Sequence, residues 1–77
     1  MTFHDRGELG EFFADVRQQK GLTLRQAAKL TDVDNAHISQ IELGKIRDPR
    51  FSVMVRLCKG YGLDIRRVAR LALESQL

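Results

Sequence analysis

The stretch from Thr23 to Leu43, TLRQAAKLTDVDNAHISQIEL, constrains the fold more than any other part of this 77-residue chain. Its apolar residues fall into two short groups, which predicts two short helices joined by a polar turn. Thr23 can cap the first helix and Asp34 the second, because a side-chain oxygen of each can accept a hydrogen bond from an amide of the opening turn. Asp32 is expected in the turn, since Asp tolerates a left-handed conformation. The rest of the chain should be organised around this pair of helices.

The first helix of the pair should pack closely against another helix. Its apolar positions are Leu24, Ala27, Ala28 and Leu30. The two alanines are small enough to allow a close approach. The run is expected to break at Thr31 and Asp32, and Val33 should be a buried residue of the turn.

The second helix, residues 35–43, has an apolar and a polar side. Ile38 and Ile41 form its apolar side, with Val33 just ahead of them. The side chains that face away from this core are Asn35, Ala36, His37, Ser39 and Gln40. Short amides, a hydroxyl and an imidazole are suited to contacting the edges of base pairs. The two helices therefore have the helix-turn-helix layout, in which the second helix reads DNA.

Residues along most of the chain match a family pattern. They are Leu9-Gly10, Arg17, Gly21-Leu22-Thr23, Ala28, Val33, Ile38-Ser39-Gln40-Ile41-Glu42, Gly44-Lys45, Pro49, Leu57, Gly62-Leu63-Asp64-Ile65 and Val68. With these residues the chain resembles the Xre, or lambda-repressor-like, DNA-binding domains, also known as the Cro/C1 type. The ISQIELGK block together with TLRQAA is the most specific part of the match. The resemblance implies an all-α fold of five helices with a central helix-turn-helix, and an ion pair between Arg17 and Glu42.

An amphipathic helix is expected over residues 8–20, ahead of the central pair. Leu9, Phe13 and Val16 recur at i, i+4 and i+7, so one face of this helix should be buried. Gly21 follows as a stop signal.

Two further helices are expected after the central pair. The first, residues 51–61, carries Cys58 on its apolar side, so this cysteine should lie in the core. Phe51 should pack at the start of this helix. The last helix, residues 65 to about 75, should be capped by Asp64.

The expected domain spans residues 8–77, after an arm of residues 1–7 that shows no periodicity. We interpret the arm as a flexible tail, and the alternative is an arm that enters a groove of DNA. Leu71, Leu73 and Leu77 are expected to lie off the apolar stripe of the last helix. These leucines predict a homodimer joined through that helix, the alternative being a frayed helix end in solvent.

The resemblance assigns residues to two kinds of DNA contact. Asn35, Ala36 and Gln40 are the best candidates for base reading, with His37 and Ser39 flanking them. Gln40 can bond adenine through two atoms, and the Ala36 methyl can contact thymine. The residues expected to hold the phosphate backbone are Thr23, Arg25, Gln26, Lys45, Arg47 and Arg50. The three basic residues after the second helix could instead belong to a solvated loop.

The expected function is sequence-specific binding of double-stranded DNA by a transcriptional regulator, a repressor or an autoregulatory controller. The alternative is a protein-interaction module on the same scaffold, such as an antitoxin-like partner binder. Asp32, Asp34 and Leu43 near the reading face favour this alternative. Asp32 stands where the family usually has Gly, and Leu43 where a polar or basic residue often reaches a phosphate. A steep dependence on salt would identify DNA binding.

Composition and motifs favour a non-enzymatic, cytoplasmic protein. The sequence shows no glycine-rich phosphate loop, catalytic set or metal-ligand cluster, so we expect no enzyme activity, metal or cofactor. His37 lacks a neighbouring nucleophile and a pocket, which favours a role at DNA over catalysis. The single cysteine fits a reducing compartment, and no apolar run approaches the length of a membrane span. The formal charge of +3 permits nucleic-acid binding without proving it.

Overall fold

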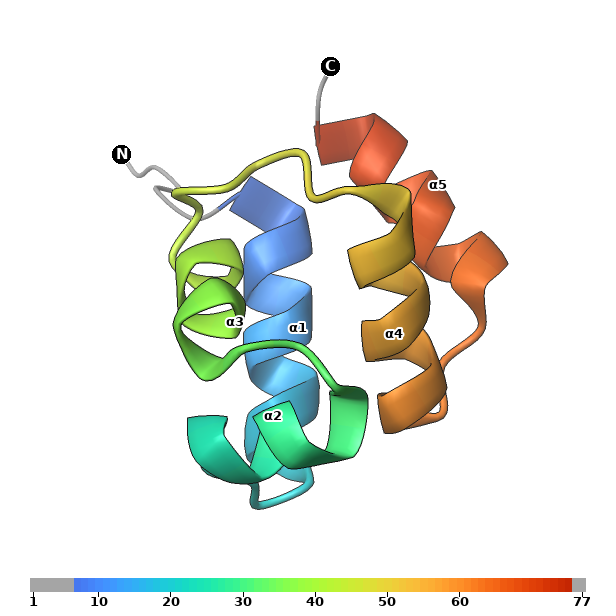
Figure 1. Cartoon of the computed structure of the whole chain (residues 1–77). Helices are drawn as coiled ribbons and strands as arrows, with labels where there is room; N and C mark the ends of the chain where they lie inside the picture. The colour runs from blue at the N-terminus through green and yellow to red at the C-terminus, as the bar shows by residue number, and fades with distance from the viewer. Residues whose placement is uncertain (1–6, 76–77) are drawn as a thin grey trace.

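Five α-helices make up the part of the chain that the computed structural model describes, residues 7–75 (Figure 1). They are α1 (Gly7–Gln19), α2 (Leu24–Thr31), α3 (Asn35–Glu42), α4 (Phe51–Tyr61) and α5 (Ile65–Ser75). The predicted five-helix, all-α architecture is confirmed, with each helix within one residue of its expected bounds. Gly7 belongs to α1 although the expected arm included it, and residues 1–6 lie outside the described residues.

One apolar core lies between the five helices. α1 packs against α3 and α5, α2 packs against α3 and α4, and α4 also contacts α5. The largest side chains that are almost completely buried are Phe13, Ile38, Ile41, Leu57 and Val68. Burying side chains of this size stabilises a fold by roughly 1.5–3 kcal/mol each. Cys58 lies in the same core, as expected, and burial raises the pKa of its thiol.

Two helix crossings are so close that they require glycine. At Gly10, where α1 crosses α3, a Cβ atom would lie 2.6 Å from the carbonyl oxygen of Ile41. At Gly60, where α4 crosses α2, a Cβ atom would lie 2.8 Å from the Cα atom of Thr31. Both distances are well below ordinary van der Waals contact. Each helix of the helix-turn-helix is therefore held by a close backbone contact with a neighbouring helix.

The ends of α2 and α3 carry the expected signals. The Thr23 hydroxyl accepts the Gln26 amide at 3.0 Å, and the Gln26 side-chain oxygen accepts the Thr23 amide at 2.9 Å. This capping box fixes the start of α2. Asp32 is left-handed with φ of 61°, and the Asp34 carboxylate accepts the Ala36 amide at 3.0 Å. The predicted caps and turn are confirmed. The hydrogen bond that the Gln26 side chain accepts was not predicted.

Three side chains near helix ends differ from expectation. Thr31 does not break α2 but ends it, since its hydroxyl donates to the Ala27 carbonyl at 2.8 Å and accepts the Val33 amide at 3.3 Å. Ala27 and Thr31, four residues apart, define the inward side of α2, which turns Leu30 outward to 50% exposure. Phe51 precedes the buried stripe of α4 and is 66% exposed rather than packed.

Tyr61 is a core residue that the sequence analysis did not identify. Its side chain is buried, and its ring centroid lies 6.5 Å from that of Phe13. The hydroxyl has no hydrogen-bond partner among the described residues. Burial raises the pKa of Tyr61 to about 12, so the phenol stays neutral at physiological pH. The ring fills the core between α1 and α4.

Candidate nucleic-acid interface

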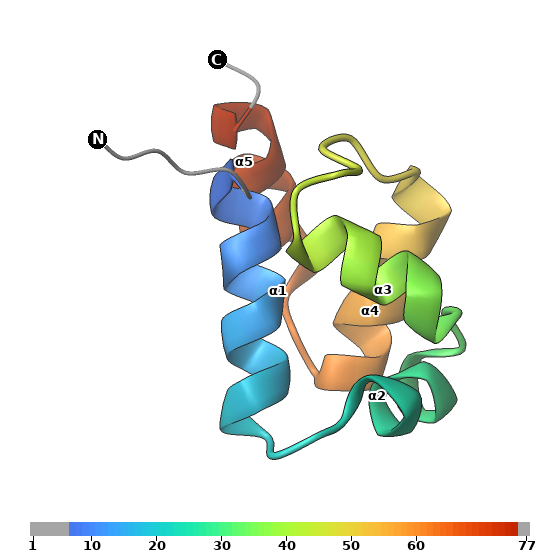
Figure 2. The same ribbon diagram turned by 90° about the vertical axis from the view of Figure 1, so that its left-hand side faces the viewer.

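α3 turns a polar side outward, as its sequence predicts. Its buried residues are Ile38, Ile41 and Glu42. Among the predicted base-reading residues Ala36 and Gln40 are exposed, and the half-buried ones are Asn35, His37 and Ser39. Figure 2 shows α3 towards the viewer, between α2 and the loop that follows α3. The five residues therefore lie on one short helix at the surface.

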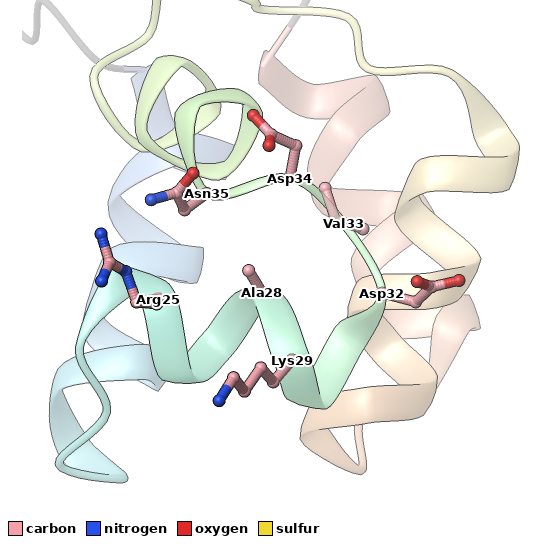
Figure 3. Close-up of a pocket in the computed structure, with 7 residues that line it drawn as sticks. All are labelled: Arg25, Ala28, Lys29, Asp32, Val33, Asp34 and Asn35. Carbon is pink, nitrogen blue, oxygen red and sulfur yellow. The ribbon is translucent and has the colours of Figure 1, made fainter.

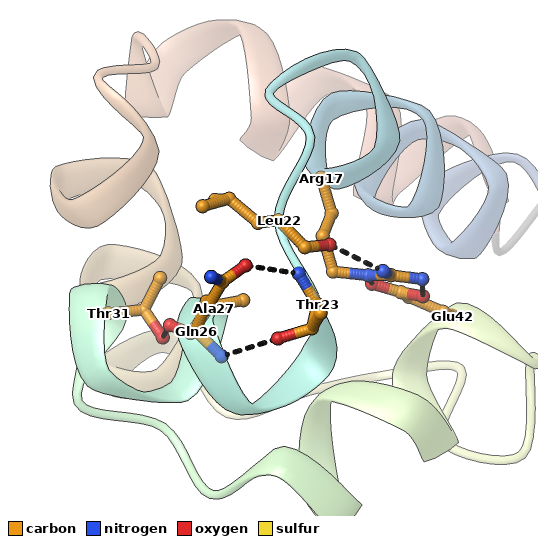
Figure 4. A network of polar contacts seen from close by, with 7 residues as sticks. All are labelled: Arg17, Leu22, Thr23, Gln26, Ala27, Thr31 and Glu42. Carbon is orange, nitrogen blue, oxygen red and sulfur yellow. Dashed lines mark hydrogen bonds and ion pairs between the residues drawn. The ribbon is translucent and has the colours of Figure 1, made fainter.

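An ion pair between α1 and α3 fixes the orientation of this helix. Arg17 donates to both carboxylate oxygens of Glu42, at 2.8 Å and 2.9 Å, and the two side chains are only 15% and 8% exposed. Arg17 also donates to the carbonyl oxygen of Leu22 at 2.8 Å, in the loop between α1 and α2 (Figure 4). The hydrogen bond with Glu42 raises the pKa of the Arg17 guanidinium. The pair that the family resemblance implies is confirmed.

The start of α2 presents hydrogen-bond donors beside α3. The capping box uses only acceptor atoms of the Thr23 and Gln26 side chains, so their hydroxyl proton and side-chain amide protons can still reach a phosphate (Figure 4). Arg25 is exposed on the same turn. A hollow between α2 and the start of α3 has Ala28 on its floor, with Arg25 and Asn35 on one side (Figure 3).

The loop after α3 is anchored from within. Gly44 is left-handed with φ of 80°, and the amides of Lys45 and Ile46 donate to the Gln40 carbonyl at 2.9 Å and 3.2 Å. Ile46 packs against the core and Pro49 is buried. The exposed cations of this loop are Lys45, Arg47 and Arg50. A loop tied down by its backbone and its apolar residues can hold these cations in place.

The six predicted phosphate-binding residues lie on two segments that flank α3. All six are exposed: Thr23, Arg25 and Gln26 at the start of α2, and Lys45, Arg47 and Arg50 in the loop. Figure 2 shows the two segments on opposite sides of α3, with α2 below and the loop above. A polar helix between two sets of donors matches a major groove, which is bordered by two phosphate strands.

The C-terminal helix departs from expectation at Leu71. This residue is half-buried and packs against the core, because it follows the buried Val68 by three positions and so falls on the inner side of α5. Leu73 does point outward, with 68% of its surface exposed. Leu77 lies outside the described residues.

Two of the three arginines of α5, Arg66 and Arg67, make contacts within the domain. Arg66 pairs with Asp64 at 3.2 Å, and its hydrogen bonds lower the pKa of the Asp64 carboxyl. The Arg67 guanidinium lies 5.5 Å from the centre of the Phe12 ring, within the range of a cation–π contact. The exposed ion pair contributes little to stability.

Residues 7–75 offer neither a membrane-crossing helix nor a metal site. No helix in this range combines the length and apolar character needed to cross a membrane. Within the same range, no three or more His, Cys, Asp or Glu side chains are grouped to hold a metal ion.

Known proteins are similar to this domain in sequence. Residues 8–71 match the family model of the helix-turn-helix domain. Over 56 residues the chain is 39% identical to the HTH-type transcriptional regulator PuuR of Escherichia coli (strain K12), and the PuuR of Shigella flexneri matches equally. The aligned region covers 73% of this chain but only 30% of PuuR.

Solved structures share its fold. The clp gene regulator ClgR from Corynebacterium glutamicum has a TM-score of 0.72 at 25% identity, covering 99% of this chain and 97% of that chain. The restriction-modification controller protein C.AhdI from Aeromonas hydrophila has a TM-score of 0.74 at 20% identity, covering 86% of this chain and 98% of that chain. The fold, the family model and the PuuR match agree with the residues that carry the resemblance. The chain belongs to the helix-turn-helix domain family, in its Xre, Cro/C1-type form.

Proposed function

We propose that this chain binds double-stranded DNA sequence-specifically and regulates transcription, as a repressor or an autoregulatory controller. The observation that carries the proposal is the outward polar side of α3, flanked by two exposed segments of phosphate-binding residues. The proposal is also supported by the family of the chain and by the PuuR relatives, which are named as HTH-type transcriptional regulators. On this proposal the chain acts in the cytoplasm, without enzyme activity, metal or cofactor.

Base readout would come from the outward side of α3. Gln40 is exposed and can bond adenine through both amide atoms, while the exposed Ala36 methyl can contact thymine. Asn35, His37 and Ser39 would reach base edges or phosphates from the flanks of the helix. Because these three side chains are half-buried, each offers less of its surface to DNA than Gln40 does. We therefore expect Gln40 to contribute most to sequence preference.

Gln40→Ala is expected to lower affinity for the selected site by about 1–3 kcal/mol and to relax preference at one base position. Its affinity for unrelated duplexes should stay unchanged. The measurement is selection from random duplexes followed by titration of the parent and the variant. Gln18→Ala is the matched control, because Gln18 is an exposed glutamine on α1. A Gln40→Ala variant that kept the sequence preference of the parent would show that α3 does not read bases in this way.

Lys45→Ala is expected to weaken binding to all duplexes alike and to reduce the slope of log affinity against log salt by about 0.9, one phosphate contact. The reason is its exposed place in the anchored loop after α3. Lys59→Ala removes the same charge from α4 and should leave the slope nearly unchanged. A loss confined to one sequence, with the slope intact, would argue against a phosphate contact at Lys45.

A protein-interaction module is the second candidate function. Asp32, Asp34 and Leu43 are all exposed at the two ends of α3, and two carboxylates there oppose the approach of phosphates. Random-duplex selection separates the two candidates. Enrichment of one sequence, with binding that weakens steeply as salt rises, supports DNA binding. A parent chain that enriches no sequence would favour a protein partner.

We also propose that α5 joins two copies of the chain, because Leu73 exposes 68% of its surface near the end of this helix. A two-fold pair would set two reading helices about 34–36 Å apart, one turn of the duplex. We expect a dimer in sedimentation at micromolar concentration, and Leu73→Glu should shift it towards monomer. Leu30→Glu, at an exposed leucine of α2, is the control. A parent that stays monomeric throughout would refute the dimer.

A further inference from the structure

A hollow lies between the end of α2 and the second half of α4, and we call it the α2–α4 hollow. Its volume is about 430 Å³, and its lining consists of Leu30, Thr31, Asp32, Arg56, Lys59 and Gly60. This volume lies within the range of about 300–1,000 Å³ that is typical of ligand-binding clefts. Leu30 exposes 50% of its surface there. The hollow is therefore large enough to receive a side chain of another molecule.

The backbone that forms the α2–α4 hollow is held in place. At Gly60, α4 comes so close to α2 that a Cβ atom would lie 2.9 Å from the carbonyl oxygen of Leu30. The last turn of α2 is tied down as well, since the Thr31 hydroxyl donates to the Ala27 carbonyl at 2.8 Å. A hollow with a fixed backbone exists before a ligand arrives, so binding costs little additional ordering.

The charges around Leu30 favour an acidic partner. Arg56 and Lys59 are both exposed, and their spacing of three residues places them on one side of α4. Within the described part of the chain, neither of these cations makes an ion pair. The lining contains two cations against one carboxylate, that of Asp32. Carboxylates on a partner can therefore pair with both cations while an apolar side chain between them covers Leu30.

The α2–α4 hollow lies away from the candidate DNA-binding surface. Figures 1 and 2 show α3 and α4 on opposite sides of the fold. Asp32 lies on the α4 side of the turn, whereas Arg25 and Asn35 lie on the other side (Figure 3). The carboxylate of Asp32 also opposes a phosphate strand at this place. DNA bound at α3 would thus leave the hollow open.

We propose that the α2–α4 hollow is a docking site for an acidic segment of a protein partner, in which carboxylates flank one large apolar side chain. The apolar side chain packs on Leu30, and the carboxylates pair with Arg56 and Lys59. Arginine suits this role because its planar group can donate two parallel hydrogen bonds to one carboxylate. The site goes beyond the proposed function, since it neither requires DNA at α3 nor blocks it.

Selection from a library of random displayed peptides tests the site, with the immobilised parent chain as bait. The enriched peptides are expected to carry Asp or Glu beside a large apolar residue. In titrations of the synthesised peptides, Leu30→Ala and Arg56→Ala should each weaken binding at least about fivefold, as side chains central to an interface do. Leu43→Ala, at a leucine that is 48% exposed, and Arg70→Ala, at an exposed arginine of α5, are the matched controls and should bind as the parent does.

Several results would overturn the inference. A selection that enriches no common peptide pattern would do so, as would peptides that bind Leu30→Ala and Arg56→Ala as tightly as the parent. Displacement of the peptides by a saturating duplex would show that the cations belong to the DNA-binding surface instead. A parent dimer that Leu30→Glu dissociates would show that a second copy of the chain covers the hollow.

The outcome for DNA binding is separate from these results. A parent that enriches no duplex sequence would refute the proposed function, and peptide binding at the α2–α4 hollow would still stand. Leu30 and Arg56 are both exposed, so their alanine variants should keep the helical fold. Circular dichroism checks this.

Discussion

Glu42→Ala is expected to lower the free energy of unfolding by about 3–5 kcal/mol, the usual cost of removing one partner of a buried ion pair. The substitution takes two hydrogen bonds from Arg17, whose side chain is only 15% exposed and cannot be fully hydrated in their place. A domain of 77 residues is expected to be stable by about 4–12 kcal/mol in total. Urea unfolding followed by circular dichroism measures the loss.

Arg66→Ala is the matched control for this prediction. It breaks the Arg66–Asp64 pair, whose side chains are 87% and 52% exposed, and should cost far less than Glu42→Ala because water hydrates and screens both charges. The double variant Arg17→Met, Glu42→Leu should recover much of the loss, because no uncompensated charge is left behind. If Glu42→Ala cost no more than Arg66→Ala, the ion pair would not be what fixes α3.

The Arg17–Glu42 pair also connects stability with the proposed function. Arg17 joins α1 to the end of α3 and, through the Leu22 carbonyl, to the loop before α2. One guanidinium therefore ties the end of α3 to the loop that leads into α2. A partial loss of this junction should let α3 turn relative to α2, which would reduce sequence preference before non-specific binding is affected.

The end signals of the helices could be predicted from sequence because their hydrogen bonds are local. Thr23 and Gln26 are three residues apart, and Asp34 bonds an amide two residues away. Asp32 adopts the left-handed conformation as a property of its own backbone. Apolar periodicity likewise gave the outward side of α3, since Ile38 and Ile41 alone define which side is buried.

Contacts between distant residues could not be predicted from composition or periodicity. Arg17 and Glu42 are 25 residues apart, and only the family resemblance paired them. In sequence Gly60 reads as part of a helix end, yet it lies against the backbone of Thr31 on another helix. Tyr61 beside it reads as a boundary residue, although its ring is buried. The burial of Leu71 likewise depends on which side of α5 meets the core.

The residues of the candidate site could be predicted from sequence, but their arrangement in space could not. The exposed residues of α3 and the six phosphate-binding candidates follow from local pattern and resemblance. Their arrangement on opposite sides of α3 follows only from the fold (Figure 2). The exposure of Leu43 likewise required the position of α3 on the core, since a leucine at a helix end is as readily buried as exposed.

Gly10→Ala is expected to destabilise the domain by about 2–3 kcal/mol, in the upper part of the range for overpacking. The added methyl would lie 2.6 Å from the Ile41 carbonyl oxygen and 2.9 Å from that of Glu42. Both are backbone atoms of α3, so no side chain can rotate away. The better helix propensity of Ala offsets up to about 1 kcal/mol, and the estimate is net of that gain. Urea unfolding measures the change.

The same substitution should move the reading helix, which gives it a second measurable effect. Restoring a contact of 3.4 Å from 2.6 Å requires α1 and α3 to separate by roughly 0.8 Å. Recognition side chains tolerate displacements of only about 0.5 Å, so specific affinity should fall more than non-specific affinity in the variant that remains folded. Asp15→Ala is the control, since it gains helix propensity at an exposed position of α1 without a clash. Equal losses of specific and non-specific affinity in Gly10→Ala would contradict this prediction. They would mean that the core absorbs the clash elsewhere and that α1 does not set the position of α3.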